Sequence, residues 1–273
     1  MKKNNSVLLS TPYILWMIAF TLIPLGVVGY YALTDPATGE FTLNNIKELG
    51  MYMPVLWRSI GYSLVSALVC LLLGYPVAYY MAHRSPFVQK FLYMLVMLPM
   101  CMSFLLRTLA WVGLLQDTGI INNLLAALGL PRLQLIRTPG AVILGMVYNY
   151  LPYMILPLYS IIVKIDNRLI EAAEDLGCNG LNVFTKVVLP LSMPGILSGL
   201  TMVFVPAVST FYISQKLGGT DTVLIGDVIE RQFKQGNNAN LGAALSLLLM
   251  VLVFVCTGIM NRFADDGEGG VIV

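Results

Sequence analysis

The chain has 273 residues, of which 58% are hydrophobic and 11% charged, whereas soluble domains average about 25% charged residues. This composition excludes an ordinary soluble enzyme and suits several membrane crossings of about 20 apolar residues each. A formal net charge of +2, without clustered Lys and Arg, excludes a nucleic-acid-binding surface. The four cysteines are scattered and form no C-x-x-C pair, so the sequence indicates neither a disulfide framework nor a metal site.

Six apolar runs are long enough to cross a bilayer, which predicts an all-α, polytopic membrane protein with six transmembrane helices. These runs fall at about 12–33, 60–82, 91–115, 141–163, 196–217 and 241–260. The first run is too long for the apolar part of a secretory signal and no convincing A-x-A site follows it, so we interpret it as an uncleaved span. We expect residues 1–273 to form a single transmembrane domain.

The charged turn between the second and third runs indicates the orientation. Residues 83–90 carry Arg84 and Lys90, and basic residues in short loops mark the cytoplasmic side. An even number of crossings then places both termini in the cytoplasm, together with the long loop 164–195.

Arg107 is the one full charge well inside an apolar run. Because it follows Phe91 by sixteen residues, it would lie about 24 Å along a continuous helix. We therefore expect its side chain to extend to the outer lipid headgroups, with a place on a substrate path as the alternative.

His83 ends the second run without a carboxylate or cysteine nearby, which indicates no metal or catalytic role.

Candidate residues for a substrate path lie toward the outer side. Aromatic faces attract cations, and six aromatic residues lie in the outer halves of the third to fifth runs: Trp111, Tyr148, Tyr150, Tyr153, Phe211 and Tyr212. Ordinary packing or a place in the interfacial aromatic belt is the alternative for each. Asp221 and Asp227 in the last outer loop indicate either a solvated loop or an acidic vestibule that favours cationic substrates.

A polar segment at 164–195 interrupts the apolar pattern. Asp166 or Asn167 can cap a helix, and Gly177 can adopt the left-handed conformation that ends one. Between them, apolar residues recur at helical spacing and form one stripe: Leu169, Ala172, Ala173 and Leu176. The other faces are acidic, whereas helices that lie on anionic lipid are rich in Lys and Arg. The segment is therefore predicted to dock on a cytoplasmic protein partner.

This segment also resembles a known family. Glu171-Ala172-Ala173, then Gly177 and finally Val187-Val188-Leu189-Pro190 are similar in sequence and spacing to the EAA loop of the membrane subunits of bacterial ABC importers. The resemblance implies the type I ABC importer permease fold, in which this loop forms a coupling helix that docks in a groove of a separate ATPase. The positions carried over as ATPase-coupling residues are Glu171, Ala172, Ala173, Leu176, Gly177 and Pro190.

The chain has no G-x-x-x-x-G-K-[ST] segment, the loop that cradles nucleotide phosphates. We therefore expect a transport subunit that is not an enzyme, has no catalytic residue and binds no cofactor. ATP and Mg²⁺ would belong to the partner ATPase.

A narrower resemblance rests on four further stretches. They are Leu73–Tyr79, Leu156–Ser160, Glu171–Gly177 and Leu224–Ile229, and they are similar to the B-type permease subunit of spermidine/putrescine importers. The resemblance implies a bacterial cytoplasmic (inner) membrane location. The implied partners are a second, C-type permease, an ATPase dimer and an external polyamine-binding protein.

Three alternatives stay open. The same importer class could carry another small solute. An ion-coupled secondary transporter would show inverted repeats and acids at mid-membrane, and an intramembrane enzyme would need paired polar groups within the spans; the sequence shows neither.

Overall fold

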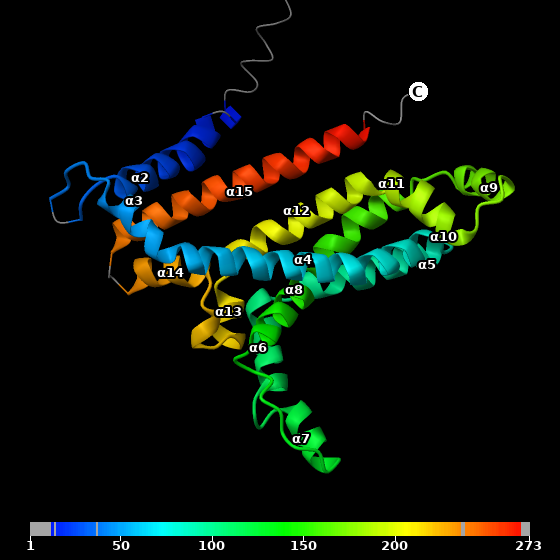
Figure 1. Cartoon of the computed structure of the whole chain (residues 1–273), viewed down its shortest axis with the longest axis horizontal. Coiled ribbons are helices and arrows are strands. Elements are labelled where there is room, and N and C mark those ends of the chain that lie inside the picture. Colours follow the sequence, from blue (N-terminus) through cyan, green and yellow to red (C-terminus); the bar gives the residue numbers. More distant parts are fainter. Residues whose placement is uncertain (1–11, 14, 37, 236–237, 269–273) are drawn as a thin grey trace, which may run out of the picture. The chain divides into compact units, whose positions relative to one another are not determined.

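A computed structural model describes residues 12–13, 15–36, 38–235 and 238–268, with the side chains of the last helix described as far as Met260 and at Arg262. The two ends of the chain, which the sequence predicts to face the cytoplasm, lie outside this range. The described residues form helices joined by turns and loops, with a single isolated bridge between Thr34 and Phe41, which confirms the all-α class. In chain order its helices are η1 (Ile18–Leu22), α2 (Ile23–Ala32), α3 (Asn44–Glu48), η2 (Leu49–Tyr52), α4 (Met53–Ala82), α5 (Pro86–Met97), η3 (Leu98–Cys101), α6 (Phe104–Leu115), α7 (Ile120–Ala127), α8 (Pro139–Ile162), α9 (Asn167–Asp175), α10 (Gly180–Val183), η4 (Phe184–Val188), α11 (Leu189–Leu191), α12 (Met193–Ser209), α13 (Tyr212–Leu217), η5 (Thr220–Thr222), α14 (Ile225–Lys234) and α15 (Ala239–Glu268) (Figure 1).

Among the described residues, five helical segments are long and apolar enough to cross a membrane. They are Leu15–Ala32, Asn44–Ala82, Phe104–Ala127, Pro139–Ile162 and Ala239–Met260. A sixth arises if Gly180–Leu191 and Met193–Ser209, which meet at a bend of 63°, count as one span. The chain is therefore a polytopic membrane protein, as its composition predicts.

The third predicted span, 91–115, is wrong as a single helix. The chain is helical to Cys101 and starts a new helix at Phe104, because Met102 is extended at φ −89° and ψ 147°. Pro99 lies just before the break, and proline removes a backbone donor that a continuous helix would use. The fifth predicted span, 196–217, is interrupted in the same way at Thr210, where φ is −65° and ψ is 141°.

The described residues divide between two compact units, one within Met1–Pro54 and Val228–Leu252 and the other within Val55–Asp227 and Val253–Val273. A buried polar network organises the first unit. Asn45 Nδ2 donates to Ala32 O at 3.2 Å and to Thr34 O at 3.0 Å, and Asn240 Nδ2 donates to Thr34 O at 2.6 Å. Carbonyl groups at a helix C-terminus have no donor within the helix, so these amides satisfy them and fix the turn after α2.

In the second unit, α8 and α12 pack closely because α12 carries Gly195 and Gly199 four residues apart. Small residues at this spacing let membrane helices approach each other. A Cβ added at Gly199 would lie 2.6 Å from Met154 Sδ and 3.3 Å from its carbonyl oxygen, and one at Gly195 would lie 3.2 Å from Pro157 O. The contact between the two helices therefore requires glycine.

We expect Gly199→Val to lower the stability of the purified chain by about 3 kcal/mol, the upper range for overpacking. Gly258→Val in α15 is the matched control, because a Cβ there meets nothing within 4 Å. Unfolding temperatures of both variants in one detergent test the prediction. Equal losses would show that the α8–α12 contact tolerates a larger side chain.

Candidate functional site

Helix α9 is a capped, self-contained element in the segment 164–195. The Asp166 side chain accepts a hydrogen bond from Arg168 N at 3.0 Å, which confirms Asp166 as the cap. At the other end Gly177 has a φ of +82°. Gly177 N donates to Glu174 O at 2.8 Å and Cys178 N donates to Ala173 O at 3.1 Å, the paired bonds of a Schellman motif. Both ends of α9 are thus fixed by local chemistry.

The inner face of α9 packs on its own chain. Ala173 is 8% exposed and lies in a cluster with Val183 and Val188. Of the positions carried over from the EAA motif, Ala173 is therefore the one whose side chain is used inside the loop, where it is not accessible to another protein. Its small size lets α9 lie against α10 and η4.

The outer face of α9 is apolar and uncovered. Leu176 is 87% exposed and Leu169 is 49% exposed, and Ala172 lies between them on the same exposed face. Glu171, Gly177 and Pro190 are also exposed. The predicted stripe is thus divided, with Ala173 turned inward and the other three residues turned outward. Exposed apolar residues rimmed by charge are typical of a protein-docking surface.

The segment is anchored to two of the long helices. Phe184 lies edge-on to Tyr75 of α4, with ring centroids 5.4 Å apart, and 6.2 Å from Tyr79. The Tyr75 hydroxyl is hydrogen-bonded to Ser192 Oγ at 2.8 Å, at the start of α12. A displacement of α9 would therefore reach both α4 and α12 through packed side chains.

The structure groups some of the six candidate aromatic residues and separates others. Tyr150 and Tyr212 lie 6.4 and 6.3 Å from Phe104, and Tyr153 lies 6.4 Å from Tyr150, measured between ring centroids. Trp111 and Tyr148 form a pair of their own at 5.4 Å. Phe211 is 40% exposed. The sequence did not single out Phe104, because a phenylalanine in an apolar run gives no distinguishing signal.

Arg107 does not reach the lipid headgroups, so that expectation is wrong. Its side chain is 6% exposed, and neither Nε nor Nη1 has a hydrogen-bond partner in the described part of the chain. It lies close enough to the Tyr150 hydroxyl to interact with it electrostatically. The first turn of α6 thus carries a buried cation beside the cluster of Phe104, Tyr150, Tyr153 and Tyr212.

The two candidate acids, Asp221 in η5 and Asp227 in α14, do not form a vestibule. Asp227 is 3% exposed, and its Oδ2 accepts from Leu224 N at 2.8 Å, which caps the start of α14. Ser59 Oγ accepts from Ile225 N at 2.8 Å at the same helix end. Asp221 is exposed, and its backbone carbonyl accepts from Arg58 Nη1. The Asp227 carboxylate therefore serves the fold, and of the two acids only Asp221 presents its side chain to the surface.

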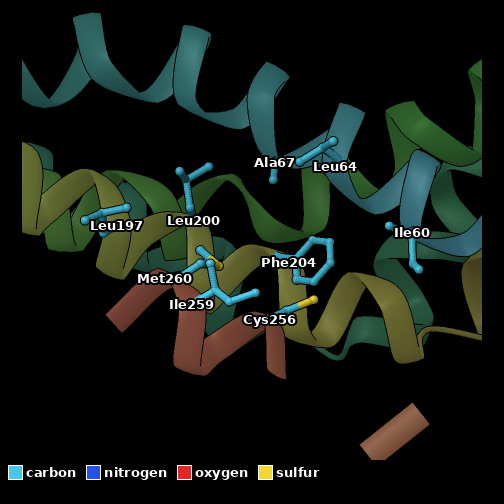
Figure 2. Close-up of a pocket in the computed structure, with 9 residues that line it drawn as sticks. All are labelled: Ile60, Leu64, Ala67, Leu197, Leu200, Phe204, Cys256, Ile259 and Met260. Atoms are coloured by element: carbon cyan, nitrogen blue, oxygen red, sulfur yellow. The ribbon is translucent and has the colours of Figure 1, made fainter. Parts of the chain in front are cut away.

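An apolar groove of about 350 Å³ lies in the second unit among α4, α12 and α15. Figure 2 shows the residues that line it: Ile60, Leu64, Ala67, Leu197, Leu200, Phe204, Cys256, Ile259 and Met260. A polycation in a membrane needs acids, carbonyl groups or aromatic faces, and this lining offers a single aromatic ring. The groove suits hydrocarbon and does not suit a cationic substrate.

The chain is similar to known transport proteins. Residues 71–266 match the family described as binding-protein-dependent transport system inner membrane component. The spermidine/putrescine transport system permease protein PotB of Haemophilus influenzae is 40% identical over 247 residues, which cover 87% of this chain and 86% of that protein. PotB of Escherichia coli is 38% identical over the same length, with 87% and 90% covered.

One solved structure shows how far the fold similarity extends. A chain of a bacterial ABC transporter involved in the import of the acidic polysaccharide alginate superposes with a TM-score of 0.77 at 20% identity, and the match covers 97% of this chain and 96% of that one. At this identity the likeness concerns the fold alone.

Proposed function

The chain belongs to the family of binding-protein-dependent transport system inner membrane components, and on this premise we propose that it is the permease subunit of an ATP-driven polyamine importer. The protein is a multi-pass transport subunit of the inner membrane. The polyamine substrate is supported by relatives named as spermidine/putrescine permeases, which are 38–40% identical over most of the chain.

The exposed stripe of α9 is the observation that carries the coupling role. A helix held by a cap at each end, with Leu169, Ala172 and Leu176 turned outward, is prepared to dock without further ordering. Since the chain has no phosphate-binding loop of its own, its energy must come from a partner, and a separate ATPase dimer is that partner. In this arrangement the segment 164–195 and both termini face the cytoplasm.

Transport would proceed by alternating access. An external polyamine-binding protein delivers the substrate on one side, and closure of the ATPase pair moves α9 on the other. Phe184 passes this movement to α4, and the Tyr75–Ser192 hydrogen bond passes it to the start of α12. A second, C-type permease completes the path and supplies acids at mid-membrane, since the six apolar runs predicted from the sequence contain no Asp or Glu. The aromatic cluster around Phe104 offers ring faces to ammonium groups on the way.

Uptake by the assembled complex tests the substrate. We expect vesicles that carry the permease pair, the ATPase and the binding protein to accumulate labelled spermidine and putrescine in the presence of ATP. Each polyamine should compete with the other, and a labelled unrelated solute should stay outside. ATP-driven uptake of the unrelated solute without uptake of either polyamine would keep the importer class and overturn the substrate.

A further inference from the structure

A polar cavity of about 300 Å³ lies where α4 turns into α5, beside the end of α8 and the start of α9. The residues that line it are Ala82, His83, Arg84, Gln89, Ile162, Val163, Ile165 and Asn167. All of them belong to the second compact unit. The lining contains two basic side chains and no carboxylate, so an anionic group fits its charge.

The walls of this cavity are held in place by hydrogen bonds. Gln89 Nε2 donates to Ala82 O and to Arg84 O, both at 2.9 Å, and Gln89 Oε1 accepts from the Tyr159 hydroxyl at 3.3 Å. One glutamine thus ties the α4–α5 turn to α8. The cavity does not have to be formed by its ligand, which lowers the ordering cost of binding.

The two basic side chains are positioned at the cavity. His83 Nδ1 donates to Tyr79 O at 2.9 Å, which leaves Nε2 as its position for a further proton or partner. The Arg84 guanidinium lies 4.1 Å from the centre of the Tyr80 ring, a cation–π contact that keeps the charge at the end of α4. The nearby Asp166 side chain caps α9, and Lys164 adds a further exposed positive charge next to the lining.

Three features of the surroundings suit a position at the level of the lipid headgroups. It lies at the ends of α4 and α8, two helices of membrane-spanning length. Tyr79 and Tyr80 are adjacent to it in sequence, and tyrosine is enriched at the membrane–water interface. Phe87, in the first turn of α5, is 81% exposed, which suits a side chain inserted into lipid. Basic pockets between membrane helices on the cytoplasmic side bind anionic headgroups.

We propose that this cavity binds the phosphate-bearing headgroup of an anionic phospholipid, with Arg84 as its cationic contact and His83 beside it in the lining. The assignment to the cytoplasmic leaflet rests on the proposed function, which sets the side of the membrane. Asn167, the first residue of α9, lines the same cavity. A bound headgroup therefore contacts the first residue of α9.

Lipid binding to the whole importer tests this proposal. The complex is placed in phosphatidylcholine nanodiscs with increasing fractions of phosphatidylglycerol, and tightly bound phosphatidylglycerol is counted by native mass spectrometry. Arg84→Gln should weaken this binding about fivefold, which corresponds to about 1 kcal/mol for one basic residue near the surface. Arg132→Gln, an exposed arginine elsewhere in the chain, is the charge-matched control and should bind as the wild type does.

Two results would overturn the proposal. One is equal lipid binding by Arg84→Gln and Arg132→Gln. The other is displacement of phosphatidylglycerol by an equal concentration of inorganic phosphate, which would identify a site for free anions. A His83→Gln variant gives an independent reading and should also bind less lipid. Since the assay contains neither polyamine nor ATP, a failure of polyamine uptake and a failure of lipid binding are distinguishable.

Discussion

Replacing Leu176 by aspartate should weaken binding of the ATPase about a hundredfold while leaving the fold of the permease unchanged. Leu176 is 87% exposed, so the chain itself loses almost no packing. In a docked complex the same side chain would be buried against the ATPase, where loss of a central apolar contact costs about 3 kcal/mol. Titration of the ATPase onto the permease in nanodiscs gives the affinity, and the unfolding temperature of the permease gives its stability.

Leu128→Asp provides the matched control for this experiment. Leu128 is 68% exposed and directly follows α7, in a loop that the proposed orientation places on the opposite side of the membrane. The same change in charge and size there should leave ATPase binding as it is. If Leu176→Asp binds the ATPase as tightly as Leu128→Asp does, then Leu176 is not a docking residue.

The segment 164–195 was predictable from the sequence wherever its chemistry is local. Asp166 caps the nearest backbone N–H groups, and Gly177 adopts the positive φ that ends the helix; both depend only on residues within one turn. The division between Ala172 and Ala173 was not predictable. Which alanine turns inward is decided by Val183 and Val188, which follow ten or more residues later and meet Ala173 only in the folded loop.

In the membrane spans, too, some features were predictable from the sequence and others were not. The structure begins α8 at Pro139 and ends it at Ile162, close to the predicted 141–163, because hydropathy alone sets such limits. The break at Met102 escaped prediction, because hydropathy does not register backbone conformation and the proline that precedes it, Pro99, was not used to divide the run. Asp227 was misplaced for a related reason: a carboxylate caps a helix only where that helix starts, and the start of α14 at Ile225 was not expected.

The break at Met102 also explains the error for Arg107. The predicted position assumed one straight helix from Phe91, whereas Arg107 is the fourth residue of a new helix that begins at Phe104. At this position the positive charge of Arg107 lowers the stability of the fold for two reasons. The guanidinium is buried without hydrogen-bond partners for Nε and Nη1 in the described chain, and the N-terminus of a helix carries partial positive charge.

We therefore expect Arg107→Met to raise the free energy of unfolding by about 2 kcal/mol, within the range by which apolar residues outperform buried charges of similar volume. Unfolding temperatures in one detergent measure this effect. Arg107→Lys keeps the charge and should give no gain, and Arg132→Met on the exposed loop should stay within about 0.5 kcal/mol. A less stable Arg107→Met would show that the guanidinium is held by favourable contacts.

Polyamine uptake by Arg107→Met and Arg107→Lys tests whether the buried positive charge has a role in transport. Functional sites commonly retain groups that lower stability, and Arg107 borders the aromatic cluster proposed for the path. If Arg107→Met is more stable and alters polyamine uptake while Arg107→Lys restores it, the buried charge acts on transport. If uptake stays unchanged in both variants, Arg107 has no role on the path.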